Sequence, residues 1–187
     1  MINIPFEAFT KIPRLRRGCV ITEKIDGTNA QIYIPELPFE GELATLPFLV
    51  GSRNRWITRD QDNYGFANWA YSNVDELLKL GPGHHYGEWW GAGIQRRYGL
   101  SEKRFSLFNV GRWKDVQLPA GVSLVPTIYD GIFSDWAITD ALDKLRNEGS
   151  LAAPGFMQPE GIIIYHSASR QLFKVTLEKD AEHKGKQ

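Results

Sequence analysis

The chain has 187 residues, and its 22 Lys and Arg side chains balance 22 Asp and Glu side chains. This balance excludes an overall field that would attract nucleic acid or membrane, so any contact with a polynucleotide must come from local basic clusters. The single cysteine excludes an intrachain disulfide, and we expect a reducing, cytoplasmic compartment. The sequence contains no apolar run of the roughly 20 residues that a membrane span needs.

The first part of the chain predicts short strands. Residues 19–23 and 30–34 are apolar runs on either side of an Asp-Gly turn, and we interpret them as a hairpin-like pair. Prolines and a glycine predict a loop over residues 35–47. A further strand is expected to begin at Phe48 and to run into residues 51–55.

The rest of the chain predicts two helices among strands. Helical spacing of apolar residues covers about 62–80, where a Gly-Pro pair ends it. A second helix is predicted to begin after Ser134 as N-cap and to stop at Gly149. Strands are expected near residues 84–90, 105–110, 122–129, 161–165 and 171–177, with a frayed polar tail over 178–187.

The tryptophans are interpreted mainly as core residues. We expect Trp69, Trp113 and Trp136 to be buried in the core. Trp89 and Trp90 are neighbours in a predicted strand, so their side chains should lie on opposite sides of it.

Lys24 stands at the end of an apolar run and is followed by Ile25, Asp26 and Gly27. This arrangement would hold an ammonium group rigidly over a tight turn, where a nucleophilic lysine could meet a phosphate. A surface hairpin with a solvated lysine is the alternative, because short motifs often match by chance.

Three further charged residues lie in or beside strand-like runs. Glu88 lies in an aromatic run bracketed by glycines, Glu160 directly precedes an apolar strand, and Lys174 lies inside another. Charges in such positions are costly unless they are paired or bind a charged group. Together with Lys24 they indicate a shared site on one face of a sheet that could hold a nucleoside triphosphate and its metal, although edge-strand charges facing water would give the same pattern.

These segments, taken in order, resemble the motifs of covalent nucleotidyltransferases, the ATP-dependent RNA and DNA ligases and the mRNA capping enzymes. Asn29 and the run Gly51-Ser52-Arg53-Asn54-Arg55 make the RNA ligase branch the best match. The resemblance spans residues 20–178. The matching motifs are Lys24-Ile25-Asp26-Gly27, Ser52-Arg53, Tyr86-Gly87-Glu88, Phe105 to Val110, Glu160-Gly161-Ile162-Ile163 and Lys174-Val175.

The resemblance implies an α+β, ATP-grasp-like nucleotidyltransferase domain, in which antiparallel sheets with flanking helices enclose an ATP pocket. We expect residues 1–187 to form this one adenylyltransferase domain, without an OB-fold domain. It further implies that the enzyme uses ATP with Mg²⁺ or Mn²⁺ and joins the 5′-phosphate and 3′-hydroxyl ends of RNA or DNA. Lys24 would carry AMP, Glu160 would act on the metal, and Lys174 would act on the α-phosphate. A neighbouring cation such as Lys174 and partial desolvation would favour the neutral amine that must attack.

Other roles follow from the resemblance alone. Asp26 and Gly27 would shape the turn that carries the nucleophile. The remaining ATP-binding roles fall to Glu23 beside the adenine edge, Asn29 near the phosphates or metal-bound water, Arg53 on the nucleotide or the accepting phosphate, Glu88 on the ribose hydroxyls and Phe108 on the base.

Short basic clusters are candidates for nucleic-acid binding, in particular Arg53 with Arg55 and Arg96 with Arg97. Solvated surface is the alternative for such isolated clusters.

Two positions depart from the family pattern, since Asn109 replaces an expected aspartate and Thr176 replaces the second lysine of the last motif. Thr176 keeps open a non-catalytic nucleotide- or RNA-binding protein with this fold. A guanylyltransferase of the capping type, which uses GTP, is the other alternative.

Overall fold

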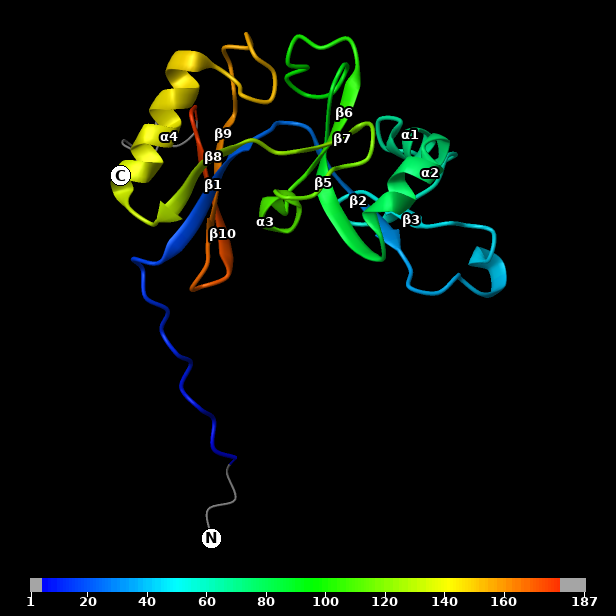
Figure 1. Ribbon diagram of the computed structural model, residues 1–187, viewed down its shortest axis with the longest axis horizontal. Coiled ribbons are helices and arrows are strands. Elements are labelled where there is room, and N and C mark those ends of the chain that lie inside the picture. The colour runs from blue at the N-terminus through cyan, green and yellow to red at the C-terminus, as the bar shows by residue number, and fades with distance from the viewer. Residues whose placement is uncertain (1–4, 179–187) are drawn as a thin grey trace, which may run out of the picture.

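The computed structural model describes residues 5–178, which form two β-sheets lying side by side (Figure 1). The smaller sheet has four antiparallel strands in the order β10-β9-β1-β8. Its strands are β1 (Gly18–Lys24), β8 (Thr127–Ile132), β9 (Gly161–His166) and β10 (Gln171–Thr176).

The larger sheet has six strands in the order β4-β3-β2-β5-β6-β7. Its neighbours are antiparallel except for β6 and β7, which are parallel. Its strands are β2 (Thr28–Ile34), β3 (Leu49–Gly51), β4 (Trp56–Ile57), β5 (Gly83–Gly91), β6 (Lys103–Leu107) and β7 (Val122–Leu124).

The two longest helices cover the outer faces of the two sheets, one on each, as Figure 1 shows. Phe66 and Ala70 pack with Ile32, Trp89 and Phe105 in the core of the larger sheet. A separate core joins helix residues such as Ala141 and Leu145 to strands of the smaller sheet. The helices are α1 (Phe66–Ser72), α2 (Val74–Leu77), α3 (Val110–Trp113) and α4 (Asp135–Glu148), with 3-10 turns at Gly41–Leu43 and Leu78–Leu80.

The prediction of a hairpin around Lys24 is wrong. β1 pairs with β8 and β9, whereas β2 pairs with β3 and β5 in the other sheet. The turn after Lys24 therefore carries the chain from one sheet to the other. Apolar alternation gives the side of a strand that is buried but not the strand that lies beside it, so the local pattern could not reveal this crossing.

Other predicted boundaries also change. The helix expected over 62–80 is interrupted at Asn73, whose backbone leaves the helical region. The strand expected over 122–129 divides between the two sheets around Pro126, because proline lacks the N–H that a continuous ladder requires. The strand expected over 105–110 ends at Leu107.

The second predicted helix is confirmed. The Ser134 hydroxyl accepts a hydrogen bond from the Ala137 amide at 3.2 Å, and Gly149 follows the last turn. Trp136, in contrast, is 67% exposed, so its assignment to the core is wrong. Trp89 and Trp90 are both buried and belong to cores on opposite sides of β5.

The predicted frayed tail lies almost wholly outside residues 5–178. Within that described range no helix has the length and apolar character needed to cross a membrane.

Candidate active site

Lys24 is the last residue of β1, and its Nζ lies 2.5 Å from Oε2 of Glu160. Both side chains are largely buried at the end of the smaller sheet. Gly161 pairs with Lys24 across β1 and β9. A Cβ at Gly161 would lie 2.1 Å from the Val175 carbonyl oxygen, so glycine permits the tight approach of β10 beside the ion pair.

The last predicted lysine, Lys174, lies on the same sheet face as Lys24. Lys24 lies in one row with Gly161 and Thr176, and the next row on the same face contains Lys174. Lys174 is exposed. The structure thus brings Lys24 and Lys174 to one surface and places Thr176, the departure from the family pattern, directly across β9 from Lys24.

Glu88 reaches the same turn from the larger sheet, so the prediction that it shares one sheet face with Lys24 and Lys174 is wrong. Its residue is only 8% exposed, and its carboxylate accepts hydrogen bonds from the Gly27 amide at 3.0 Å and from Asn29 Nδ2 at 3.3 Å. Burial raises the pKa of Glu88 to about 7, while the Gly27 N–H and the positive charge of Lys24 oppose the rise. At neutral pH this carboxyl group is therefore poised between its two protonation states.

Gly27 lets the turn lie against β5. A Cβ at this position would be 2.5 Å from the Trp89 carbonyl oxygen and 2.7 Å from Trp90 Cβ. Real side chains do not make such contacts, so any larger residue would push the turn away from Glu88.

Glu23 lies on the other face of β1 from Lys24. Its buried carboxylate accepts hydrogen bonds from the Ser150 hydroxyl at 2.6 Å and from the Leu151 and Ala152 amides at 2.8 and 2.9 Å. Burial raises the pKa of Glu23, and these three donors counteract the rise. The side chain predicted to lie at the adenine edge is therefore engaged inside the protein, where it fixes the 150–152 segment to the strand that carries Lys24.

Asp26 is fixed by the loop between β5 and β6. Its carboxylate binds Nε of Arg96 at 3.1 Å, and its amide donates to the Tyr98 hydroxyl at 2.7 Å. The Arg96 guanidinium also binds both carboxylate oxygens of Glu178, each at 3.1 Å. Arg96, predicted to contact nucleic acid, is thus occupied by two carboxylates.

Sequence reasoning missed Tyr98. The loop that carries it has left-handed backbone at the non-glycine residues Gln95, Arg97 and Tyr98. Such strain persists only where surrounding contacts hold it, and it concentrates at functional sites. No local pattern in the sequence pointed to these conformations.

The other predicted binding residues lie on the surface of the larger sheet. Arg53 and Arg55 are exposed in the turn between β3 and β4. Phe108 is 40% exposed just after β6, and its amide donates to the Tyr86 carbonyl at 3.0 Å. Arg97 is exposed in the loop between β5 and β6.

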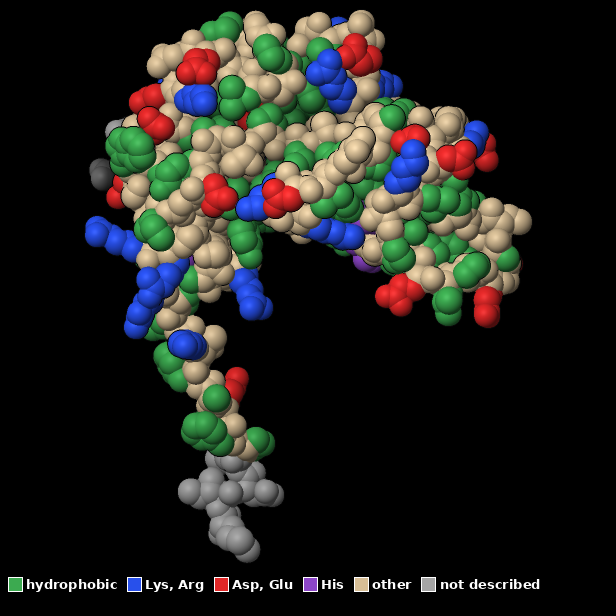
Figure 2. Space-filling view, in the orientation of Figure 1, with side chains coloured by type: hydrophobic (Ala, Val, Ile, Leu, Met, Phe, Trp, Pro, Cys, Tyr) green, Lys and Arg blue, Asp and Glu red, His purple; other side chains and the backbone are tan. Residues whose placement is uncertain are grey.

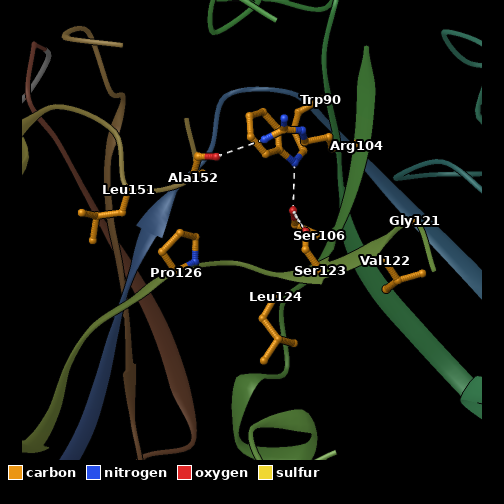
Figure 3. A pocket seen from close by; sticks show the side chains of 10 residues that line it. All are labelled: Trp90, Arg104, Ser106, Gly121, Val122, Ser123, Leu124, Pro126, Leu151 and Ala152. Carbon is orange, nitrogen blue, oxygen red and sulfur yellow. Dashed lines mark hydrogen bonds between the residues drawn. The ribbon is translucent and has the colours of Figure 1, made fainter. Parts of the chain in front are cut away.

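A pocket of about 450 Å³ lies between the two sheets, and Figure 3 shows the side chains that line it. Trp90 donates to the Ser106 hydroxyl in one wall, while Leu151 and Ala152 form another. Lys24, Glu88 and Glu160 do not line this pocket. It nevertheless adjoins their site, because Trp90 packs against Gly27 and the 150–152 segment is bound to Glu23.

The residues present suit Mg²⁺ or Mn²⁺ held mainly by substrate. Between residues 5 and 178 no group of three His, Cys, Asp or Glu side chains is arranged to hold a metal. Mg²⁺ commonly binds through one or two carboxylates together with substrate phosphates and water. Glu160, whose Oε1 has no hydrogen bond within the described chain, offers such a carboxylate.

Comparison with known proteins identifies the family. Residues 17–176 match the RNA ligase family. The chain belongs to the RNA ligase family. No curated protein matches the chain in sequence.

Solved RNA ligases have the same fold. A *Naegleria gruberi* RNA ligase variant with AMP and Mn superimposes with a TM-score of 0.63 at 19% identity, covering 90% of this chain and 52% of the other. Another variant of that ligase, with ATP and Mn, gives a TM-score of 0.62 at 19% identity over the same shares, 90% and 52%. This member of the RNA ligase family therefore spans about half the length of the ligases it matches.

Proposed function

We propose that this protein is an ATP-dependent polynucleotide ligase that joins RNA ends through a covalent Lys24–AMP intermediate. The observation that carries the proposal is the pairing of Lys24 with Glu160, on a sheet face that also bears Lys174 and opposite a buried carboxyl group, Glu88. A structural lysine has no need of this arrangement at a turn between two sheets.

In the proposed reaction the neutral amine of Lys24 attacks the α-phosphorus of ATP. The new N–P bond replaces the bond to pyrophosphate, which leaves. A 5′-phosphate oxygen then attacks the same phosphorus and releases Lys24, giving an adenylylated strand. Finally a 3′-hydroxyl attacks the 5′-phosphate, forms the phosphodiester and releases AMP. Fixed positive charge beside the phosphate stabilises the charge that develops at each transfer, and Lys174 is the candidate for it.

Glu160 has two consistent roles in this scheme. Its carboxylate pairs with the Lys24 ammonium. A divalent ion, when bound, neutralises phosphate charge, and Glu160 is the carboxylate that would hold it. Release of Lys24 from Glu160 would free the amine for attack.

The remaining residues would bind the nucleotide. Glu88 can accept hydrogen bonds from ribose hydroxyls while Gly27 and Asn29 keep it oriented. Phe108 offers an exposed ring to the base, and Arg53 offers a cation to a phosphate. *Naegleria gruberi* RNA ligase structures that contain ATP or AMP together with Mn support the choice of nucleotide and metal.

Transfer of label from ATP labelled on its α-phosphate, with Mg²⁺ present, tests the covalent step. We expect the wild type and the surface variant Lys79→Ala to take up acid-labile label, and Lys24→Ala to take up none while remaining folded at the assay temperature. Sealing of splinted RNA ends by Lys24→Ala at the wild-type rate would refute the mechanism.

The same assay distinguishes the two alternatives. Label taken from GTP and not from ATP would indicate a guanylyltransferase. No label from either nucleotide, with bound AMP excluded by mass spectrometry, would favour a non-catalytic binding protein, for which Thr176 in the row of Lys24 is the supporting observation.

A further inference from the structure

A row of aromatic side chains continues from the proposed site along the larger sheet. Glu88 pairs with Asn29, and the next two rows on the same face are Tyr86 with Gln31 and His84 with Tyr33. The face that holds the ribose-binding candidate therefore carries rings further along β5.

These rings form a continuous surface with Trp56, which follows the turn between β3 and β4. His84 stacks on Tyr86 with centroids 5.6 Å apart and planes within 5°. His84 also contacts Tyr33 at 4.5 Å and Trp56 at 6.4 Å. We call Tyr33, Trp56, His84 and Tyr86 the aromatic row.

The aromatic row is open to solvent. Tyr86 is 53% exposed and Trp56 is 46% exposed, although both side chains are large and apolar enough to be core residues. Trp56 lies over Gly51, where a Cβ would be 3.1 Å from its ring atom Cε3. The strand thus accommodates a flat ring on its surface. Phe39, from the loop after β2, packs against Tyr33 at one end of the row with ring centroids 6.2 Å apart, while Trp56, His84 and Tyr86 remain exposed. Neighbouring exposed rings of this kind commonly mark an interaction site.

Positive charge accompanies the rings. Arg53 and Arg55 are exposed in the turn just before Trp56, and neither has an ion pair within the described part of the chain. Lys and Arg side chains also border the hollow between the two sheets in Figure 2. Stacking rings next to cations are typical of surfaces for single-stranded nucleic acid, because every base has a flat face and every linkage has a negative charge.

Resting on the proposed function, we propose that the aromatic row binds unpaired nucleotides of the polynucleotide substrate by stacking. The row begins beside Glu88 and Phe108, so a strand whose end reaches the nucleotide site would continue over Tyr86 and His84 towards Trp56. Duplex RNA keeps its bases stacked inside the helix and cannot use these rings in the same way.

Fluorescence anisotropy with a labelled single-stranded RNA of twelve nucleotides, and with the same strand in a blunt duplex, tests this inference. Trp56→Ala and Tyr86→Ala should each weaken binding of the single strand roughly tenfold, as expected for loss of one stacked base. Trp136→Ala, which removes an exposed tryptophan from α4, is the matched control and should bind as the wild type does.

Two further variants separate stacking from packing and from charge. Trp56→Phe should retain most of the affinity, whereas Trp56→Leu should lose as much as Trp56→Ala. Arg55→Ala should reduce the slope of log affinity against log salt by about 0.7, while the ring variants leave that slope unchanged. Thermal unfolding of each variant monitors the fold.

The outcomes also separate this inference from the proposed function. Labelling of Lys24 by ATP needs no polynucleotide, so Trp56→Ala and Tyr86→Ala should label at the wild-type rate. Unchanged single-strand affinity in both variants, or an equal loss for the duplex, would overturn the stacking surface even if labelling succeeds. A change in sedimenting mass with unchanged RNA affinity would instead assign the row to contact with a second copy of the chain. Absence of label with ring-dependent RNA binding would refute the ligase mechanism and leave the aromatic row in place.

Discussion

At the scale of single residues, the site contains a buried carboxyl group, that of Glu88, whose pKa lies close to neutral pH. Glu88 contacts the Gly27 amide and Asn29 and is nearly excluded from water. Because desolvation raises its pKa to about 7, folding favours its protonated form over the charged form.

The sign of the resulting pH effect follows from this shift. The folded pKa of Glu88 lies above the ordinary value of 4.5, so its contribution to stability is fully present below pH 4.5 and falls as pH rises to about 7. We expect the wild type to lose, relative to Glu88→Gln, on the order of 3 kcal/mol of unfolding free energy over this range. Urea titrations at several pH values measure the difference. The exposed variant Glu148→Gln should follow the wild type, and a flat difference curve for Glu88→Gln would contradict the assignment.

Gly27 allows a second prediction at this scale. Gly27→Ala should reduce the free energy of unfolding by about 1–3 kcal/mol, because its methyl group overlaps the Trp89 carbonyl and Trp90 Cβ. Gly111→Ala is the matched control, since the nearest atom to its Cβ is 3.9 Å away. Because alanine favours a helix over glycine, this variant should be as stable as the wild type or more stable by up to about 1 kcal/mol. Chemical denaturation measures both, and equal stabilities would show that the turn can move away from β5 without cost.

At the scale of elements, β1, which ends in Lys24, is bound to other segments of the chain on both of its faces. On one face Glu23 binds the 150–152 segment, which precedes β9. On the other face Lys24 binds Glu160 at the start of β9. Alternation along a single strand thus places the Glu23 carboxylate and the Lys24 amine on opposite faces of the sheet, although the two residues are neighbours in sequence.

Glu23→Gln tests the structural half of this arrangement. A glutamine can keep its oxygen on the Leu151 and Ala152 amides and turn its NH₂ group to the Ser150 hydroxyl, which can accept, but these hydrogen bonds then lose their charged acceptor. The variant should therefore lose about 1 kcal/mol of unfolding free energy. Thermal unfolding of Glu23→Gln beside Glu148→Gln measures the loss. If Glu23 acted on the nucleotide alone, the two variants would be equally stable and would differ only in labelling by ATP.

At the scale of the whole molecule, Arg96 ties together segments that are distant in sequence. It joins Asp26, in the turn between the sheets, to Glu178 beyond β10 and to the Gln158 carbonyl. Glu178 is mostly exposed, so this pairing contributes little stability. The main effect of the Arg96 contacts should be to fix the turn next to Lys24.

Arg96→Lys should therefore slow the labelling of Lys24 by ATP roughly tenfold, since small displacements of a nucleophile are costly, with little change in unfolding temperature. Lysine keeps the positive charge but lacks the planar guanidinium group that binds the carboxylates of Asp26 and Glu178 at the same time. Arg97→Ala, an exposed neighbour, should label at the wild-type rate when no polynucleotide is present. Equal rates for Arg96→Lys and the wild type would show that the bonds from Arg96 to Asp26 and Glu178 are not needed to position Lys24.

The sequence by itself determined the family motifs, most strands, the helix from Asp135 to Glu148 and its Ser134 cap, because these depend on local spacing and on residue chemistry. It also placed Lys24 and Lys174 at strand positions that share one face, with Glu160 directly before the strand between them, whereas Glu88, expected on the same face, comes from the other sheet. Only the tertiary structure decided that β1 and β2 lie in different sheets, that Glu23 is engaged internally and that Arg96 and Tyr98 hold Asp26. These features depend on pairings between segments far apart in the chain, and the local pattern of a strand specifies the face it buries but not the partner it meets.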